Sequence, residues 1–297
     1  MSRPDFFASL ASRTIINDGG MGTQLIAAGM PVGTCTELWN VEHPEVIRRV
    51  HERYAAAGCD LLTTNSFGGS RRSLMNHGCD DRVELLNRTA AELARDAAGD
   101  GAWVMGDVGP FGDFLEPLGT TTPQELKDIF TEQIAALKAG GADGVNIETM
   151  SDPGEIAVAI DAAKTVDARW PVIASFCFQK AGETFRTMMG VDVETAIKSL
   201  VDAGADVVGS NCGTDLSLDD YVRLADEMVQ AAGQTPVILS PNAGAPVMVN
   251  GEATYKATPA DMAGYVPRLL ATGLRVLGGC CGTTPDHLRA MAAAVKE

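Results

Sequence analysis

Short apolar runs rich in β-branched residues alternate along the chain with longer segments of helical periodicity. The apolar runs are expected to form eight strands, at residues 14–17, 60–65, 103–107, 144–148, 171–176, 206–210, 236–240 and 275–277. The segments that follow them are expected to form helices at residues 44–57, 82–98, 123–139, 153–165, 193–203, 218–231, 259–271 and 285–295. Eight strands that alternate with helices predict an α/β fold, the (β/α)8 or TIM barrel.

The residues at the segment ends agree with this fold. Several predicted helices begin with proline, whose missing N–H costs nothing in a first turn, and several are followed by glycine, as at Gly204 and Gly273. The 297 residues show no shift in composition and no low-complexity linker, so we expect one domain over residues 1–297. The pair Asn250-Gly251 is typical of a hairpin, but we expect it to lie in a long loop.

The charge and the cysteine pattern exclude several classes of function. There are 39 acidic and 23 basic residues, a net charge of −16, which repels nucleic acids and anionic membranes. No apolar run is long enough to span a membrane, and the first residues lack the apolar core of a signal peptide. Seven cysteines without disulfide-framework spacing indicate a reducing compartment, so we expect a cytoplasmic protein.

Three cysteines lie directly after two of the predicted strands. Cys212 follows the sixth strand, and the adjacent Cys280 and Cys281 follow the eighth. In this fold the carboxyl ends of the strands meet on one face, so the three thiols are expected to come together. Three thiolates on a zinc ion leave one position open for a substrate. The residues alone leave two readings open, because a free cysteine is often only a small buried apolar residue.

Polar residues follow most of the other strands. Asp18, Asn65, Asp107 and Glu148 are candidates for a substrate site, although each also has a structural alternative, and Asp107 is the weaker candidate because polar strand ends often only satisfy loop amides. The other cysteines are expected to be packing residues: Cys35, Cys59, Cys79 and Cys177. The histidines are expected at surface or capping positions: His43, His51, His77 and His287.

Seven phrases in a fixed order carry a family resemblance: DGGMGTQL at 18–25, TNSF at 64–67, GDVGP at 106–110, IET at 147–149, GSNC at 209–212, PNAG at 241–244 and GGCCGTTP at 278–285. On these residues the chain resembles the zinc-dependent homocysteine S-methyltransferases. Within that family it is most similar to the homocysteine-binding module of cobalamin-dependent methionine synthase. The resemblance extends over nearly the whole sequence.

The resemblance implies an activity and a set of site residues. It implies one Zn²⁺ held by Cys212, Cys280 and Cys281, and L-homocysteine as the methyl acceptor that becomes methionine. No catalytic residue is needed beyond the substrate thiolate. Substrate-binding roles then follow for a second set of residues: Asp18, Gly19, Gly20, Asn65 and Glu148. Glu148 is expected to pair with the ammonium group, and the glycines to offer N–H groups to the carboxylate.

The methyl donor has more than one candidate. The resemblance implies a methylcorrinoid such as methylcobalamin, supplied by a partner protein in a split methionine synthase. Gly68 and Gly69 follow Phe67, where a betaine-using relative has tyrosine, which argues against betaine. Betaine or a sulfonium such as S-methylmethionine is the alternative donor. A non-catalytic subunit that binds zinc and homocysteine, and a thiol redox protein, are the alternatives to a methyltransferase.

Overall fold

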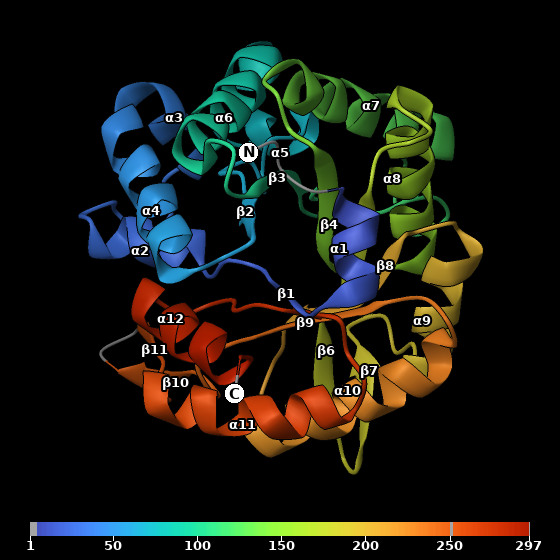
Figure 1. Cartoon of the computed structure of the whole chain (residues 1–297). Helices are drawn as coiled ribbons and strands as arrows, with labels where there is room; N and C mark the ends of the chain where they lie inside the picture. Colours follow the sequence, from blue (N-terminus) through green and yellow to red (C-terminus); the bar gives the residue numbers. More distant parts are fainter. Residues whose placement is uncertain (1–4, 250–251, 297) are drawn as a thin grey trace.

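A computed structural model describes residues 5–249 and 252–296 and shows a ring of parallel strands surrounded by helices (Figure 1). The ring consists of β1 (Ile15–Ile16), β2 (Leu61–Thr63), β3 (Trp103–Val108), β4 (Gly144–Met150), β5 (Val172–Phe176), β8 (Val207–Cys212), β9 (Val237–Pro241) and β12 (Val276–Leu277). The strand order is β1-β12-β9-β8-β5-β4-β3-β2. The N–H of Asp60 donates to the carbonyl of Ile16 at 2.7 Å and joins the two ends of this sheet. The predicted (β/α)8 barrel is therefore confirmed.

The outer layer contains the expected helices. Their bounds lie within a few residues of the prediction: α4 (Pro44–Ala57), α6 (Val83–Ala98), α7 (Pro123–Ala139), α8 (Pro153–Val166), α9 (Val193–Asp202), α10 (Leu218–Ala232), α11 (Pro259–Ala271) and α12 (Pro285–Ala294). Local sequence sets where they begin. Thr122 with Glu125, and Thr258 with Asp261, form capping boxes that satisfy the first N–H groups of α7 and α11. None of the helices in the described part of the chain is both long and apolar enough to cross a membrane.

A short helix covers the amino-terminal end of the barrel. Helix α1 (Phe6–Ser12) precedes the first strand, and Phe6 and Leu10 are buried in one cluster with the strand residues Leu61 and Trp103. The rings of Phe6 and Trp103 meet edge to face with their centroids 5.6 Å apart. With this end closed by packing, the open end of the barrel is the one at which the strands finish.

Further short elements were not expected: α2 (Met21–Ala27), η1 (Thr36–Leu38), α3 (Trp39–Glu42), α5 (Arg71–Met75) and η2 (Asp80–Arg82).

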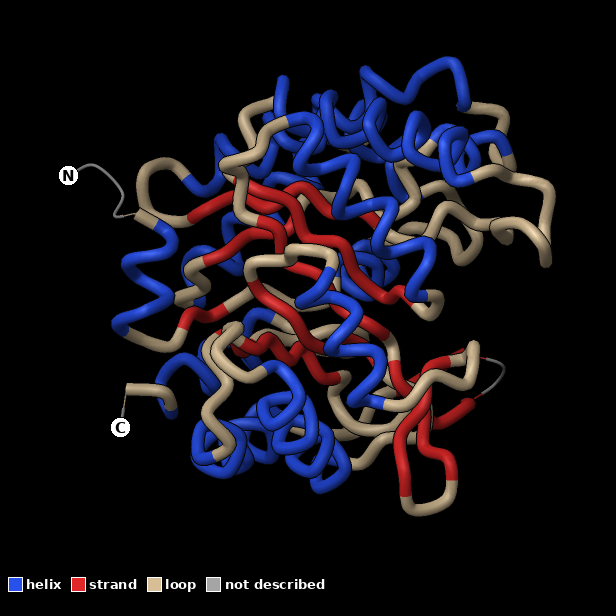
Figure 2. The backbone as a smooth tube through the Cα atoms, turned by 90° about the vertical axis from the view of Figure 1, so that its right-hand side faces the viewer, coloured by secondary structure: helices blue, strands red, loops and turns tan. Residues whose placement is uncertain are grey.

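Two antiparallel strand pairs lie at the opposite end from α1 (Figure 2). One pair is β6 (Phe178–Ala181) with β7 (Thr184–Thr187), and the other is β10 (Val247–Val249) with β11 (Glu252–Thr254). The segment around Asn250-Gly251, expected to be a long loop, contains strand pairing that was not expected, because Val247 pairs with Thr254 and Val249 with Glu252. Residues 250–251 themselves lie outside the described residues. Strands β10 and β11 are each three residues long, which is too short for an alternation of apolar and polar residues to reveal them in the sequence.

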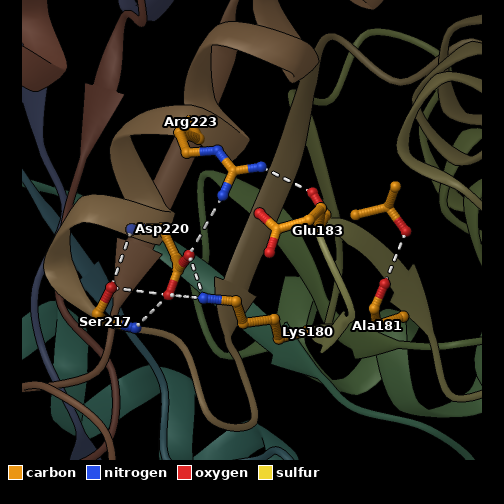
Figure 3. Close-up of polar contacts among 7 residues, drawn as sticks. Lys180, Ala181, Glu183, Ser217, Asp220 and Arg223 are labelled. Carbon is orange, nitrogen blue, oxygen red and sulfur yellow. Dashed lines mark hydrogen bonds and ion pairs between the residues drawn. The ribbon is translucent and has the colours of Figure 1, made fainter.

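The β6–β7 pair is tied to helix α10 by charged side chains (Figure 3). Lys180 Nζ lies 2.9 Å from Oδ1 of Asp220, and Oδ2 of the same carboxylate accepts a hydrogen bond of 2.7 Å from Ser217 Oγ. Arg223 donates to the carbonyl of Glu183 at 2.7 Å. Asp220 is buried and joins the hairpin to the first turn of the helix. The hairpin is thereby held in place beside the open end of the barrel.

One histidine departs from its expected position. His287 caps α12, as expected. His51 on α4 is instead fully buried. Neither ring nitrogen of His51 has a hydrogen-bond partner among the described residues. The expectation of a surface or capping position is wrong for His51. Burial lowers its pKa to about 4. The side chain is therefore a neutral part of the core.

His51 should make the protein less stable in mild acid. An unfolded histidine titrates near a pKa of about 6.5, so between pH 6.5 and pH 4 the unfolded state binds a proton that the folded state does not. Relative to His51→Met, the wild-type free energy of unfolding should fall by about 3 kcal/mol across this window. Urea unfolding of both proteins at several pH values measures the difference. His77→Met, at an exposed histidine, is the control, and parallel curves for wild type and His51→Met would contradict the prediction.

Candidate metal centre and substrate cavity

The three cysteines that follow the sixth and eighth barrel strands come together at the open end. Each pair among the Sγ atoms of Cys212, Cys280 and Cys281 lies within 4.8 Å, and the Sγ atoms of Cys280 and Cys281 are 3.9 Å apart. Two thiolates 2.3 Å from one tetrahedral zinc would be about 3.8 Å apart. A disulfide would instead need an S–S distance of about 2.05 Å. The cluster can therefore bind a metal ion.

Strand β9 brings the two cysteine segments together. Cys212 pairs with Pro241 in the ladder between β8 and β9, and the N–H of Cys280 donates to the carbonyl of the same Pro241 at 2.8 Å. The carbonyl of Cys212 accepts a hydrogen bond of 2.6 Å from Tyr221. Gly282 completes the turn with φ +78°, and a Cβ on it would lie 2.2 Å from the ring of Tyr255. The glycine after the cysteine pair is thus required by the backbone and by the aromatic packing.

The sulfur atoms of this cluster cannot all carry a charge without a cation. Cys177, from the end of β5, lies beside Cys212, and its thiol together with those of Cys280 and Cys281 holds the pKa of Cys212 below its usual range. The same contacts raise the pKa of Cys177 and of Cys280, and they raise that of Cys281 to about 11. One thiolate is stabilised at the expense of its neighbours. A divalent cation would remove this conflict, so the donor set fits a thiophilic metal such as zinc.

The expectation for the remaining cysteines is only partly confirmed. Cys35, Cys59 and Cys79 are buried in apolar clusters, as expected of packing residues. Cys177 is partly exposed and adjoins the cluster of Cys212, Cys280 and Cys281, so packing alone does not describe it. Its position at a strand end was the only signal in the sequence.

A cavity of about 270 Å³ opens beside the cysteines. Its lining includes all of the residues expected to bind substrate: Asp18, Gly19, Gly20, Asn65 and Glu148. It also includes Asp107 and the hydroxyl residues Thr23, Thr64 and Ser66. Among the described lining residues there is no lysine, arginine or histidine. The cavity is therefore strongly acidic and suits a ligand with a positive charge.

Asp18 and Glu148 are held by neighbouring polar groups. Both carboxylate oxygens of Asp18 accept from Thr63, one from its N–H and one from its hydroxyl, each at 2.8 Å. Glu148 accepts from Asn146 Nδ2 at 2.7 Å. Burial raises the pKa of Asp18 to about 8 and that of Glu148 to about 7. Both groups therefore gain from a cation that would stabilise their ionised forms.

Asn65 and the two glycines have structural partners as well. The side-chain amide of Asn65 donates to the carbonyl of Thr36 at 2.8 Å, which fixes the residue in the cavity wall. The N–H of Gly20 already donates to Thr283 Oγ1 at 3.1 Å. A Cβ on Gly20 would lie 2.7 Å from the carbonyl of Cys280, and one on Gly19 would lie 2.6 Å from Thr283 Oγ1. Close packing against the cysteine loop therefore requires both glycines.

Asn211 links the cysteine cluster to the acidic cavity. Its Oδ1 accepts from the N–H of Thr149 at 2.7 Å and from Ser175 Oγ at 2.9 Å, and its Nδ2 lies 4.0 Å from Cys280 Sγ. Thr149 has φ +61°, which is a strained conformation for a β-branched residue. Asn211 thus clamps the backbone that follows Glu148. In the sequence, only its place next to Cys212 could have indicated this role.

Comparison with known proteins agrees with this geometry. The sequence profile of the family described as homocysteine S-methyltransferase matches residues 15–295. The chain belongs to this family. Family membership places the protein among the methyltransferase enzymes.

Relatives in the family include methionine synthases of two mycobacteria. The chain is 32% identical to the Mycobacterium leprae protein over 306 residues, and 31% identical to the Mycobacterium tuberculosis protein over 309 residues. Each match covers 98% of this chain and 25% of the relative. The chain therefore spans about a quarter of the length of these curated relatives.

A family member of known structure has the same fold over its full length. The homocysteine methyltransferase MmuM of Escherichia coli, in its metallated form, superposes with a TM-score of 0.77 at 25% identity, covering 96% of this chain and 98% of that one. Its apo form gives a TM-score of 0.72. The barrel is thus shared with a solved homocysteine methyltransferase over nearly the full length of both chains.

Proposed function

We propose that this protein transfers a methyl group to the thiol of L-homocysteine, giving methionine, and that Cys212, Cys280 and Cys281 hold the zinc ion that serves the reaction. The observation that carries the proposal is the convergence of three sulfurs, all within 4.8 Å of one another, on the edge of an acidic cavity. A zinc ion bound there supplies a Lewis acid that keeps a thiol ligand in its nucleophilic thiolate form.

The cavity residues bind and orient the amino acid end of homocysteine. Glu148 lies in the wall and pairs with the ammonium group. Asp18 is fully engaged by Thr63 and orders the loop that carries the glycines. Because no basic side chain lines the described cavity, the substrate carboxylate is satisfied by the N–H of Gly19 and nearby hydroxyls rather than by a salt bridge. The N–H of Gly20 does not contribute, since Thr283 already accepts it.

The preferred donor is a methylcorrinoid, such as methylcobalamin, presented by a partner protein. Similarity to the methionine synthases of two mycobacteria, over a quarter of the length of each, supports this choice. The open end of the barrel leaves the cysteine cluster accessible, since all three cysteines are partly exposed.

A small cationic donor is the second candidate, and a specific feature favours it. A cavity of about 400 Å³ adjoins the first and shares Thr149 with it. Its lining combines Met188 and Met189 with the carboxylates of Asp152 and Glu155. Apolar sulfur-containing side chains beside carboxylates suit a sulfonium such as S-methylmethionine, or the quaternary ammonium group of betaine.

A donor screen tests these proposals directly. The zinc-loaded protein is incubated with L-homocysteine and either methylcobalamin, S-methylmethionine or betaine, and methionine is quantified over time. We expect the fastest formation from methylcobalamin and none after chelation of the metal. Fast methionine formation from a sulfonium or betaine without corrinoid would replace the preferred donor. Binding of homocysteine without turnover from any donor would indicate a non-catalytic subunit.

A further inference from the structure

The substrate cavity contains a third carboxylate, Asp107, besides Asp18 and Glu148. Strand β3 places it beside the other two, and their charges interact. Asp107 differs from both in its hydrogen bonding. The residue is only 7% exposed, and its Oδ1 has no hydrogen-bond partner among the described residues. A buried carboxylate oxygen without a partner is costly, which points to a ligand that supplies one.

The main chain of Asp107 is held mainly by groups other than its own carboxylate. Its N–H donates to Thr64 Oγ1 at 2.9 Å, and its carbonyl accepts from Ser66 Oγ at 2.7 Å. Neighbouring hydroxyl groups therefore hold the main chain of Asp107, and the residue lines the cavity. Burial, followed by the charges of Glu148 and Asp18, raises the pKa of Asp107 well above its usual range. A bound cation would oppose both effects.

We propose that Asp107, together with Glu148, binds the α-ammonium group of the acceptor and makes the cavity selective for thiols that carry this positive charge. The inference rests on the proposed function and names a further specificity-determining residue for it. An ammonium group has three N–H donors and cannot be satisfied by one monodentate carboxylate. Asp18 cannot supply the second contact as readily, because both of its oxygens already accept from Thr63.

The test compares two thiols that differ only in the amino group. L-Homocysteine and mercaptobutanoate, which is homocysteine without its amino group, are titrated into the zinc-loaded wild type and into zinc-loaded Asp107→Asn. We expect the variant to bind homocysteine about 10- to 100-fold more weakly, the range for loss of a charged hydrogen bond. Its affinity for mercaptobutanoate should be unchanged or higher. Asp128→Asn, which removes an exposed carboxylate on α7, is the control.

The outcomes separate this proposal from the one on which it rests. A wild type that binds no homocysteine would overturn the proposed function itself. A wild type that binds it normally, with equal affinity in Asp107→Asn, would remove Asp107 alone from the site. An equal loss for both thiols would show a general distortion and would also refute the selective role. Zinc content and thermal unfolding are measured on each variant, and Asp107→Ala provides the same comparison where the amide variant does not fold.

Discussion

Replacing any one of Cys212, Cys280 and Cys281 by alanine should abolish stoichiometric zinc binding and, with it, methyl transfer to homocysteine. The cluster has three sulfur donors whose mutual distances fit one ion, so each variant leaves only two protein ligands. Bound metal should fall from one equivalent per chain to less than about 0.1, because each thiolate contributes a large share of the affinity. Elemental analysis of protein purified without chelator, together with the methionine assay, measures both effects.

A matched control separates this effect from a general loss of structure. Cys79 is likewise a free cysteine, but it is buried and packs with Leu74, Val83 and Leu86 in a separate apolar cluster. Cys79→Ala should lose some stability through the cavity it creates, yet keep one zinc per chain and full activity. If any variant of the three cluster cysteines purified with a full equivalent of zinc, that residue would not be a ligand.

The barrel could be predicted from the sequence because each of its units repeats the same pattern. The outer helices begin and end at signals that act locally, such as the capping box at Thr122. The elements that were missed depend on tertiary contacts instead. Helix α1 is stabilised by packing against Trp103, and the β6–β7 pair by the contact of Lys180 with Asp220. Neither partner is close in sequence to the element it stabilises, so no local pattern could indicate the contact.

The site could be predicted only as a set of positions. Because strand ends converge in this fold, Cys212 and Glu148 could be placed at one end of the barrel from their position after strands. Sequence could not show which polar atoms already have partners. Gly20 looked available for a substrate carboxylate, but its N–H is taken by Thr283, 263 residues away. Asp107 looked like one more strand-end residue until its unpartnered oxygen was seen in the cavity wall.

Glu148→Gln should weaken homocysteine binding by about 100-fold while leaving one zinc per chain. The substitution keeps the shape of the side chain and its contact with Asn146, but it removes the charge that pairs with the substrate ammonium group. Loss of one partner of a buried charge pair costs enough for a change of this size. Calorimetric titration of zinc-loaded protein measures the affinity, and elemental analysis measures the metal.

Stability distinguishes lost recognition from lost structure in this variant. Burial raises the pKa of Glu148 to about 7, so above the unfolded value of about 4.3 the folded state holds a proton that the unfolded state releases. Stability therefore falls as pH rises through this window, and the glutamine variant, which has no such proton, should be at least as stable as wild type at pH 8.

Glu155→Gln is the matched control, because burial also raises the pKa of Glu155 to about 7, but its carboxylate accepts from the N–H of Phe111 beside the neighbouring cavity. Weak binding in a stable Glu148→Gln, with normal binding in Glu155→Gln, assigns the charge of Glu148 to substrate recognition, whereas equal affinity in both would exclude it.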